Sequence, residues 1–217
     1  MSQQKSDYDD VGIDEALDSL PSDEELDAAV ENLEANGFDV TVVDTRAEAL
    51  EAVSSMIPDG ATVMDGHSTT LEEIGFMDHL TEGDHSWENL HADVWAIDDD
   101  AERFTARRKA QTADYFVGGI NAIARTGELV AADLSGSRIG AYPFAAGNVV
   151  IVSGVNKVVA DLDAALDRLE NVAYPLENER AQEAYGVESA IAKQLVYRKE
   201  PTEGRTSVVL VREQLGY

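Results

Sequence analysis

A six-residue turn contains the side chains best suited to hold an anion. It reads Asp65-Gly66-His67-Ser68-Thr69-Thr70 and joins an apolar segment at 61–64 to a helix that starts near Thr70. The free N–H groups and dipole at a helix start favour negative charge, and hydroxyl groups add donors for phosphate or carboxylate. The alternative is that Ser68 or Thr69 only caps the helix. The turn is neither a Walker motif nor a dinucleotide motif.

Two further loops supply polar groups for the same purpose. Gly119 follows a predicted strand at 115–117 and permits close approach of a ligand to the backbone, while Asn121 could donate to the ligand or cap a turn. Arg138 could bind a carboxylate or phosphate bidentately, or it could pair with Asp133. We therefore expect a ligand site formed by Gly66, Ser68, Thr69, Thr70, Gly119, Asn121 and Arg138.

Two residues are candidates for acid–base chemistry. His67 lies in the favoured turn and titrates near neutral pH, although simple ligand contact or exposure is the commoner outcome. Glu128 opens a predicted strand and could be a general base or a nucleophile, whereas most glutamates at such positions face solvent. The four histidines, at positions 67, 79, 85 and 91, fit no metal-binding spacing, so no metal site is expected.

Basic residues are concentrated at one place, 103–109. Arg103 and Arg107 would share a helix face and could dock an acidic partner or complete the anion site. Neutralisation of the neighbouring acids is the favoured interpretation.

Alternating strands and helices with short connections predict an α/β protein with a mainly parallel central sheet flanked by helices. The first predicted helix starts at the capping box Ser22 to Glu25, a strand spans 38–43, and Thr45 to Glu48 starts a second helix that Pro58 stops. Residues 1–20 lack clear periodicity and are expected to form a flexible acidic arm, and 21–217 a single domain.

The second half of the chain changes in pattern. We expect an irregular stretch at 81–93, a helix at 98–111, and then short strands at 129–132, 138–142 and 149–152. Helical spacing returns at 161–169, residues 177–197 are expected to be mostly helical with an interruption near Gly186, and a final strand covers 208–211.

Composition narrows the classes of function. The 217 residues have no cysteine and no run of about 20 apolar residues, which excludes a thiolate metal site and favours a cytoplasmic protein without a membrane span. No cofactor is expected. With 43 acidic against 16 basic residues the net charge is -27, so nucleic acid and membranes are poor partners. The dispersed acids favour a halophile's protein, because salt screens their repulsion.

The chain resembles the LUD-domain family, also called the lactate-utilisation or LutC/YkgG-like family. The most specific match is Ser68-Thr69-Thr70-Leu71-Glu72-Glu73-Ile74-Gly75. Other matching segments, in order along the chain, are 57–63, 112–114, 121–123, 127–130, 136–139 and 154–159. The resemblance covers about residue 24 to the last residue.

The resemblance implies a fold similar to the NagB/RpiA/CoA-transferase-like group and a role in lactate utilisation beside iron–sulfur subunits. Many relatives carry a cysteine-rich segment where 184–199 lacks cysteine, and many have acids in place of Arg125-Thr126. The first hypothesis is therefore a domain that binds a small carboxylate or phosphate, an iron–sulfur partner subunit, or both. The alternative is a stand-alone enzyme for a sugar phosphate or a CoA-linked molecule. A homo-oligomer is compatible with either.

Overall fold

Six strands form a central sheet in which every neighbouring pair is parallel. The computed structural model describes Tyr8 and residues 10–217. The strands lie in the order β1 (Asp39–Val43), β10 (Thr206–Val211), β7 (Asn148–Gly154), β4 (Tyr115–Gly119), β2 (Thr62–Asp65) and β3 (Glu88–Asn89). A parallel sheet is buried on both faces and needs nearly continuous apolar strands, as the sequence Asn-Val-Val-Ile-Val-Ser-Gly of β7 illustrates. The predicted α/β class is confirmed.

A smaller sheet of four strands packs on one face of the first. Its order is β8 (Val158–Val159), β5 (Ala122–Ala124), β6 (Leu129–Asp133) and β9 (Lys193–Tyr197). β5 and β6 form an antiparallel hairpin, and Gly127 in its turn has a φ of 95°, which favours glycine.

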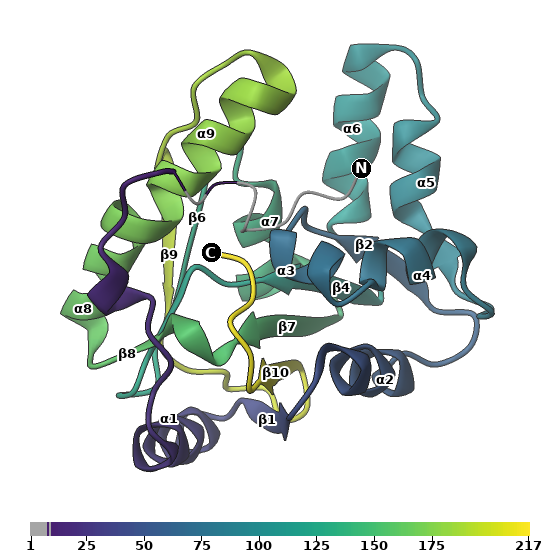
Figure 1. Cartoon of the computed structure of the whole chain (residues 1–217). Helices are drawn as coiled ribbons and strands as arrows, with labels where there is room; N and C mark the ends of the chain where they lie inside the picture. Colours follow the sequence, from purple (N-terminus) through teal and green to yellow (C-terminus); the bar gives the residue numbers. More distant parts are fainter. Residues whose placement is uncertain (1–7, 9) are drawn as a thin grey trace.

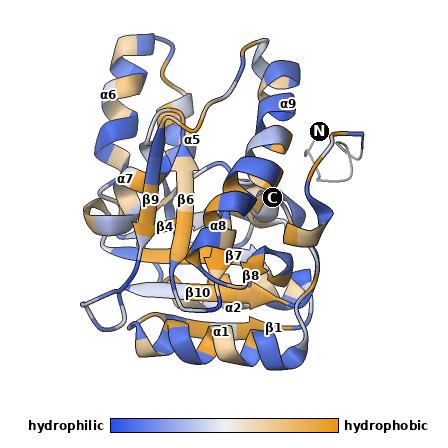
Figure 2. Ribbon diagram, turned by 90° about the vertical axis from the view of Figure 1, so that its left-hand side faces the viewer, coloured by the Kyte–Doolittle hydropathy of each residue, from blue (hydrophilic) through white to orange (hydrophobic). Residues whose placement is uncertain are grey.

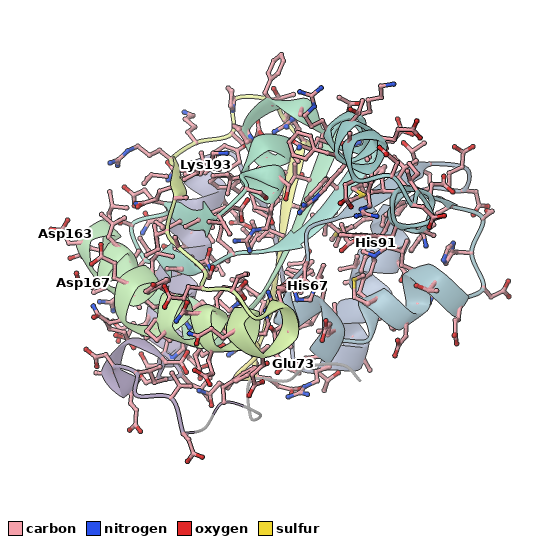
Figure 3. All side chains as sticks on the ribbon, turned by 90° about the horizontal axis from the view of Figure 1, so that it is seen from above. His67, Glu73, His91, Asp163, Asp167 and Lys193 are labelled. Carbon is pink, nitrogen blue, oxygen red and sulfur yellow. The ribbon has the colours of Figure 1, made fainter. Side chains whose placement is uncertain are left out.

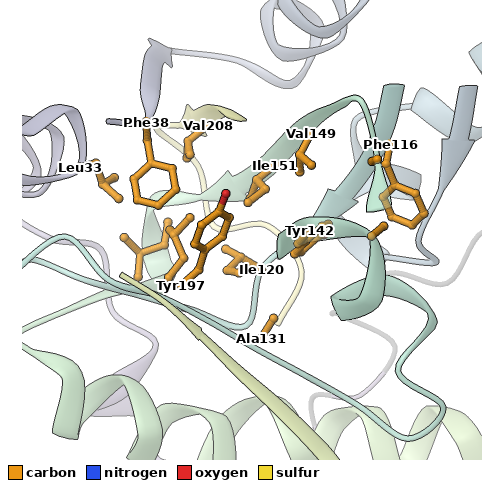
Figure 4. Packing of buried hydrophobic residues seen from close by; sticks show 14 of the residues in the cluster. Leu33, Phe38, Phe116, Ile120, Ala131, Tyr142, Val149, Ile151, Tyr197 and Val208 are labelled. Carbon is orange, nitrogen blue, oxygen red and sulfur yellow. The ribbon is translucent and has the colours of Figure 1, made fainter. Parts of the chain in front are cut away.

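The largest apolar cluster fills the space between the two sheets. It joins Ile151 and Val208 of the central sheet to Tyr197 of the smaller one, with Phe38 set edge-on against Tyr197 (Figure 4). A second cluster covers the opposite face of the central sheet, where α2 (Arg46–Met56), α3 (Thr69–Glu73) and α4 (Phe76–Glu82) lie. The hydropathy colouring shows the strands as mostly apolar and the outer faces of the helices as polar (Figure 2).

Local capping sequences start the first two long helices as predicted. α1 (Asp23–Ala35) begins with a capping box between Ser22 and Glu25, and α2 with one between Thr45 and Glu48. The other helices are α5 (Leu90–Trp95), α6 (Asp100–Ala110), α7 (Ser137–Gly140), α8 (Leu162–Arg168) and α9 (Tyr174–Tyr185). None of the helices within the described residues has the length and apolar character that a membrane span requires.

Two expectations about secondary structure are wrong. The strand predicted at 138–142 is helical, because α7 runs directly into a π-helical turn at Ala141–Ala145. The interruption predicted near Gly186 is present, since its φ of 68° closes α9, but the helix predicted beyond it is wrong, because Lys193–Tyr197 pairs with β6 as strand β9.

The predicted N-terminal arm contacts the domain over its described part. Asp18 is 4% exposed and pairs with the fully buried Arg168 of α8, and Asn156 also donates to its carboxylate. Residues 1–7 and 9 of the predicted arm lie outside the described residues.

Candidate functional site

A cavity of about 580 Å³ opens at the carboxyl edge of the central sheet, beside the ends of β2 and β4. These two strands are neighbours, so the turn after Asp65 and the loop after Gly119 lie side by side. Helix α9 rises on one side of this edge, and α5 and α6 rise on the other (Figure 1). Ligands of open α/β sheets bind at this edge of the strands.

Most of the predicted ligand-binding residues meet in this cavity. Gly66, Ser68, Thr69, Asn121 and Arg138 line it, together with His67. Thr70 and Gly119 lie directly behind its wall. The fold thus brings together three loops that are far apart in the sequence.

The turn at 66–70 leaves polar groups available to the cavity. Ser68 precedes α3, but its hydroxyl makes no capping hydrogen bond and no other bond within the described residues. The backbone N–H groups of His67 and Ser68 also have no acceptor there, whereas Gly66 donates to Val117 of β4 at 2.9 Å. α3 is only five residues long. Its dipole is therefore weak, and the donors of the turn are local hydroxyl and amide groups.

The two residues behind the wall have structural contacts. A Cβ at Gly119 would lie 2.4 Å from the Oγ of Ser68, so glycine is required for the close approach of the two loops. This glycine, predicted to permit close approach of a ligand, permits close approach of the protein's own Ser68. Thr70 accepts a hydrogen bond of 3.0 Å from the buried Lys157, which fixes the start of α3.

Arg138 holds the polar wall together. Its guanidinium pairs with Asp133 at 3.1 Å and also donates to the carbonyl of Ala132 and the side chain of Asn121. Burial acts to lower the pKa of Arg138, but the Asp133 carboxylate raises it overall, so the guanidinium stays charged. Arg138 thus pairs with Asp133, and its binding of a ligand stays a prediction.

The imidazole of His67 faces the interior of the cavity. Its side chain is 45% accessible, and His67 is among the residues that line the cavity. Burial lowers the pKa of His67 and Arg180 lowers it further, while Glu72, Glu177 and Asp65 act in the opposite direction. His67 is therefore neutral over more of the pH range than an ordinary histidine.

Several lining residues were not predicted. Glu177 and Arg180 come from α9 and form a bidentate ion pair with both hydrogen bonds at 2.7 Å, and Tyr217 donates to Glu177 at 3.1 Å. They lie more than 100 residues from the turn in the sequence, and their spacing follows no motif. Sequence reasoning had no signal for them.

Arg107 of α6 adds positive charge to the cavity. It donates to Ser137 at 2.7 Å, and within the described residues it forms no ion pair. The favoured interpretation of the basic segment holds for Arg103, which pairs with Asp100, but Arg107 fits the alternative, completion of the site.

Glu128 lies apart from this cavity. It accepts a hydrogen bond from Thr126 at 2.5 Å and pairs with Arg198 at 2.8 Å, on the hairpin of the smaller sheet. Its predicted catalytic role stays a prediction without a place in the candidate site.

The four histidines do not gather around one point. His79 and His85 pack against Trp87, whereas His91 lines the cavity and its Nδ1 atom lies 2.5 Å from an Asp65 oxygen. Within the described residues, no three metal-ligating side chains come together. Figure 3 looks down on the site and labels His67 near α9 and His91 near α5.

A second hollow, of about 590 Å³, lies beside the start of β1. Its lining includes Glu34, Asp39, Glu200 and Glu203. Carboxylates in this number repel an anion, so this hollow does not suit the predicted ligand.

These features define an α/β protein with a polar cavity at the carboxyl edge of its parallel sheet. The model of the LUD domain matches residues 26–211, and the chain therefore belongs to the LUD-domain family. A crystal structure of a DUF162 family protein from Deinococcus radiodurans is similar, with a TM-score of 0.50 and 14% identity over 89% of this chain and 99% of that one. At this identity the likeness concerns the fold alone. No curated protein matches the chain.

Proposed function

We propose that this protein is a lactate-utilisation domain that binds a small carboxylate or phosphate in the cavity beside β2 and β4. The main support is the convergence of the turn at 66–70, Asn121 and Arg138 on one cavity that also contains Arg107. Arg107 forms no ion pair within the described residues, so its charge is available to an anion. Membership of the LUD family supports the link to lactate.

The cavity offers three kinds of donor to an anion. Arg107 supplies charge, the Ser68 hydroxyl supplies a neutral donor, and the N–H groups of His67 and Ser68 supply backbone donors. Arg138 and Arg180 already share their charge with Asp133 and Glu177, so they shape the wall more than they attract the ligand.

Binding of anions by the purified protein in high salt tests this proposal. We expect lactate, pyruvate, a sugar phosphate or a CoA ester to raise the melting temperature and to give a saturable signal in calorimetry. Because hydrogen bonds to charged groups contribute about 1.5–3 kcal/mol, Arg107→Gln should weaken binding by roughly 10- to 100-fold. The double variant Ser68→Ala, Thr69→Ala should also weaken it.

The matched control is Arg212→Gln. Arg212 is a surface arginine that pairs with Asp23 and does not line the cavity. Its replacement should leave the affinity unchanged. Absence of stabilisation by every anion, or equal losses in the Arg107 and Arg212 variants, would contradict the proposal.

Exposed apolar side chains at the cavity mouth support a partner subunit as part of the same function. Trp95, Leu134, Tyr185 and Val187 are all more than half exposed and border the cavity. We propose that an iron–sulfur subunit of a lactate-oxidising system covers them. Co-purification with such subunits should be lost in Trp95→Ser, Tyr185→Ser. Retention of the complex by this variant would exclude this surface.

The volume of the cavity favours the alternative, an enzyme for a sugar phosphate or a CoA-linked substrate. Pockets of about 300–1,000 Å³ hold ligands far larger than lactate, and this one measures about 580 Å³. His67 would then be the acid–base group inside the cavity. Turnover lost in His67→Gln but kept in Glu128→Gln would favour this enzyme, and loss of turnover only in Glu128→Gln would assign the chemistry elsewhere.

A further inference from the structure

The carboxylate of Asp65, at the end of β2, is buried without a hydrogen bond. Its side chain is 1% accessible, and within the described residues neither oxygen has a hydrogen-bond partner. Burial of an ionised carboxylate is costly unless a partner compensates for the lost water. The contact that Asp65 does make is therefore informative.

That contact is with His91 of α5. The Nδ1 atom of His91 lies 2.5 Å from Oδ1 of Asp65, although the angle is outside the usual hydrogen-bond geometry. We treat the contact as a hydrogen bond on the basis of its short distance. Both groups are buried at this point, and neither has another hydrogen-bond partner in the described residues.

The other ring nitrogen of His91 is available to the cavity. Nδ1 is fully buried, but 30% of the side chain is accessible and His91 lines the cavity. Within the described residues, Nε2 forms no hydrogen bond, and Trp95, whose ring centroid is 6.0 Å away, packs against the imidazole. The exposed part of the ring thus presents Nε2 to a ligand.

The carboxylate determines which nitrogen of a neutral imidazole carries the proton. A carboxylate accepts hydrogen bonds only, so Nδ1 must be the donor toward Asp65. Nε2 then has a lone pair and acts as an acceptor. An acceptor at this point favours a ligand group with a proton to donate and disfavours a second acceptor.

We propose that His91, oriented by Asp65, selects anions that carry a hydroxyl group next to the charged group. A 2-hydroxy acid can donate its hydroxyl proton to Nε2, whereas the matching 2-oxo acid presents a carbonyl oxygen to the same lone pair. The proposal deepens the proposed function and rests on it, because the charged end of the ligand must bind at the Arg107 and Ser68 side of the cavity. Asp65 is a positioning residue.

The first test needs no variant. In protein labelled with ¹⁵N at histidine and kept at alkaline pH, where an imidazole is neutral, NMR should identify Nδ1 of His91 as protonated and Nε2 as unprotonated. Asp65→Asn should mix the two tautomers, because an amide can both donate and accept. A protonated Nε2 in the unchanged protein would overturn the proposal.

The second test compares pairs of ligands in high salt at the same alkaline pH as the first, where the imidazole is neutral. Lactate should bind more tightly than pyruvate, and 2-hydroxybutyrate more tightly than 2-oxobutyrate, by about threefold to tenfold, the range that one hydrogen bond contributes. In His91→Ala the ratio should fall to about one. The control His67→Gln changes another histidine of the cavity and should keep the ratio, even if both affinities change.

The outcomes separate the two proposals. Equal affinity for hydroxy and oxo acids, or a ratio unchanged in His91→Ala, overturns the role of His91 and leaves the anion site intact. Failure of every anion to bind overturns both proposals. The tautomer of His91 then shows separately whether Asp65 accepts a hydrogen bond from Nδ1.

Discussion

Protonation of His67 should be coupled to anion binding. Burial and Arg180 lower the pKa of His67 below its ordinary value of 6.5, so the charged imidazolium form is disfavoured. A bound anion favours the imidazolium and raises this pKa. Binding should therefore take up a proton, and affinity should increase as the pH falls below 6.5, by up to about tenfold per pH unit.

Calorimetry of lactate or phosphate binding at several pH values measures this coupling. His67→Gln should remove the proton uptake and flatten the profile. Because the folded protein holds a depressed pKa, His67 also contributes stability that is present above pH 6.5 and is lost as the pH falls toward the lowered value. Affinity that decreases with falling pH would contradict the coupling.

Residues of the site differ in how far the sequence reveals them. The turn at 66–70 is contiguous and follows a strand, so its place at the sheet edge could be predicted. His91 received no role in the site, because Asp65, the residue that contacts it, is distant in the sequence and no spacing rule links them. Arg180 and Tyr217 reach the cavity only through the packing of α9 and the last residues.

Among the helices and strands, those determined by neighbouring residues were predicted correctly, and those that depend on contacts distant in the sequence were not. The capping boxes at Ser22 and Thr45 are satisfied by neighbours within three residues, and both helices start where predicted. The segment 138–142 has apolar residues typical of a strand, but the Asp133 carboxylate accepts hydrogen bonds from the backbone N–H groups of Arg138 and Ile139, and a helix begins there. β9 needs β6 as its partner, which a local pattern cannot supply.

The contact between the N-terminal segment and α8 should stabilise the whole domain. Arg168 is fully buried, which lowers its pKa to about 9, and it pairs with Asp18 at 2.5 Å and donates to the backbone carbonyl of Asn121. Asp18→Ala would leave the guanidinium buried without its carboxylate. The free energy of unfolding, from denaturant titration, should fall by about 3–5 kcal/mol.

Asp23→Ala is the matched control. Asp23 also pairs with an arginine, Arg212, but its side chain is 87% exposed, and such pairs contribute at most about 1 kcal/mol. Similar losses in the two variants would show that the contact of Asp18 is not a buried ion pair in solution. Because Arg168 also binds Asn121, Asp18→Ala should weaken anion binding as well.

Charge is distributed unevenly over the whole molecule. The chain carries 43 acidic residues against 16 basic ones, yet Arg107, Arg138 and Arg180 all line one cavity. Asp133 and Glu177 neutralise two of these three, and Glu188 also lines the cavity, so its formal charges balance within a negative field. This field acts against anion entry at low salt, and screening should matter for both binding and stability.

Stability should depend strongly on salt. Screening shortens the Debye length from about 10 Å at 0.1 M to about 3 Å at 1 M, so repulsion between dispersed acids is removed only at high salt. We expect the urea midpoint to fall steeply as KCl is lowered from molar concentration. α1 offers a test of the cause, since Asp27, Glu31 and Glu34 are exposed at helical spacing on one face. Their replacement by Asn, Gln and Gln should reduce the salt requirement, while a midpoint equally insensitive to KCl in both proteins would contradict the repulsion argument.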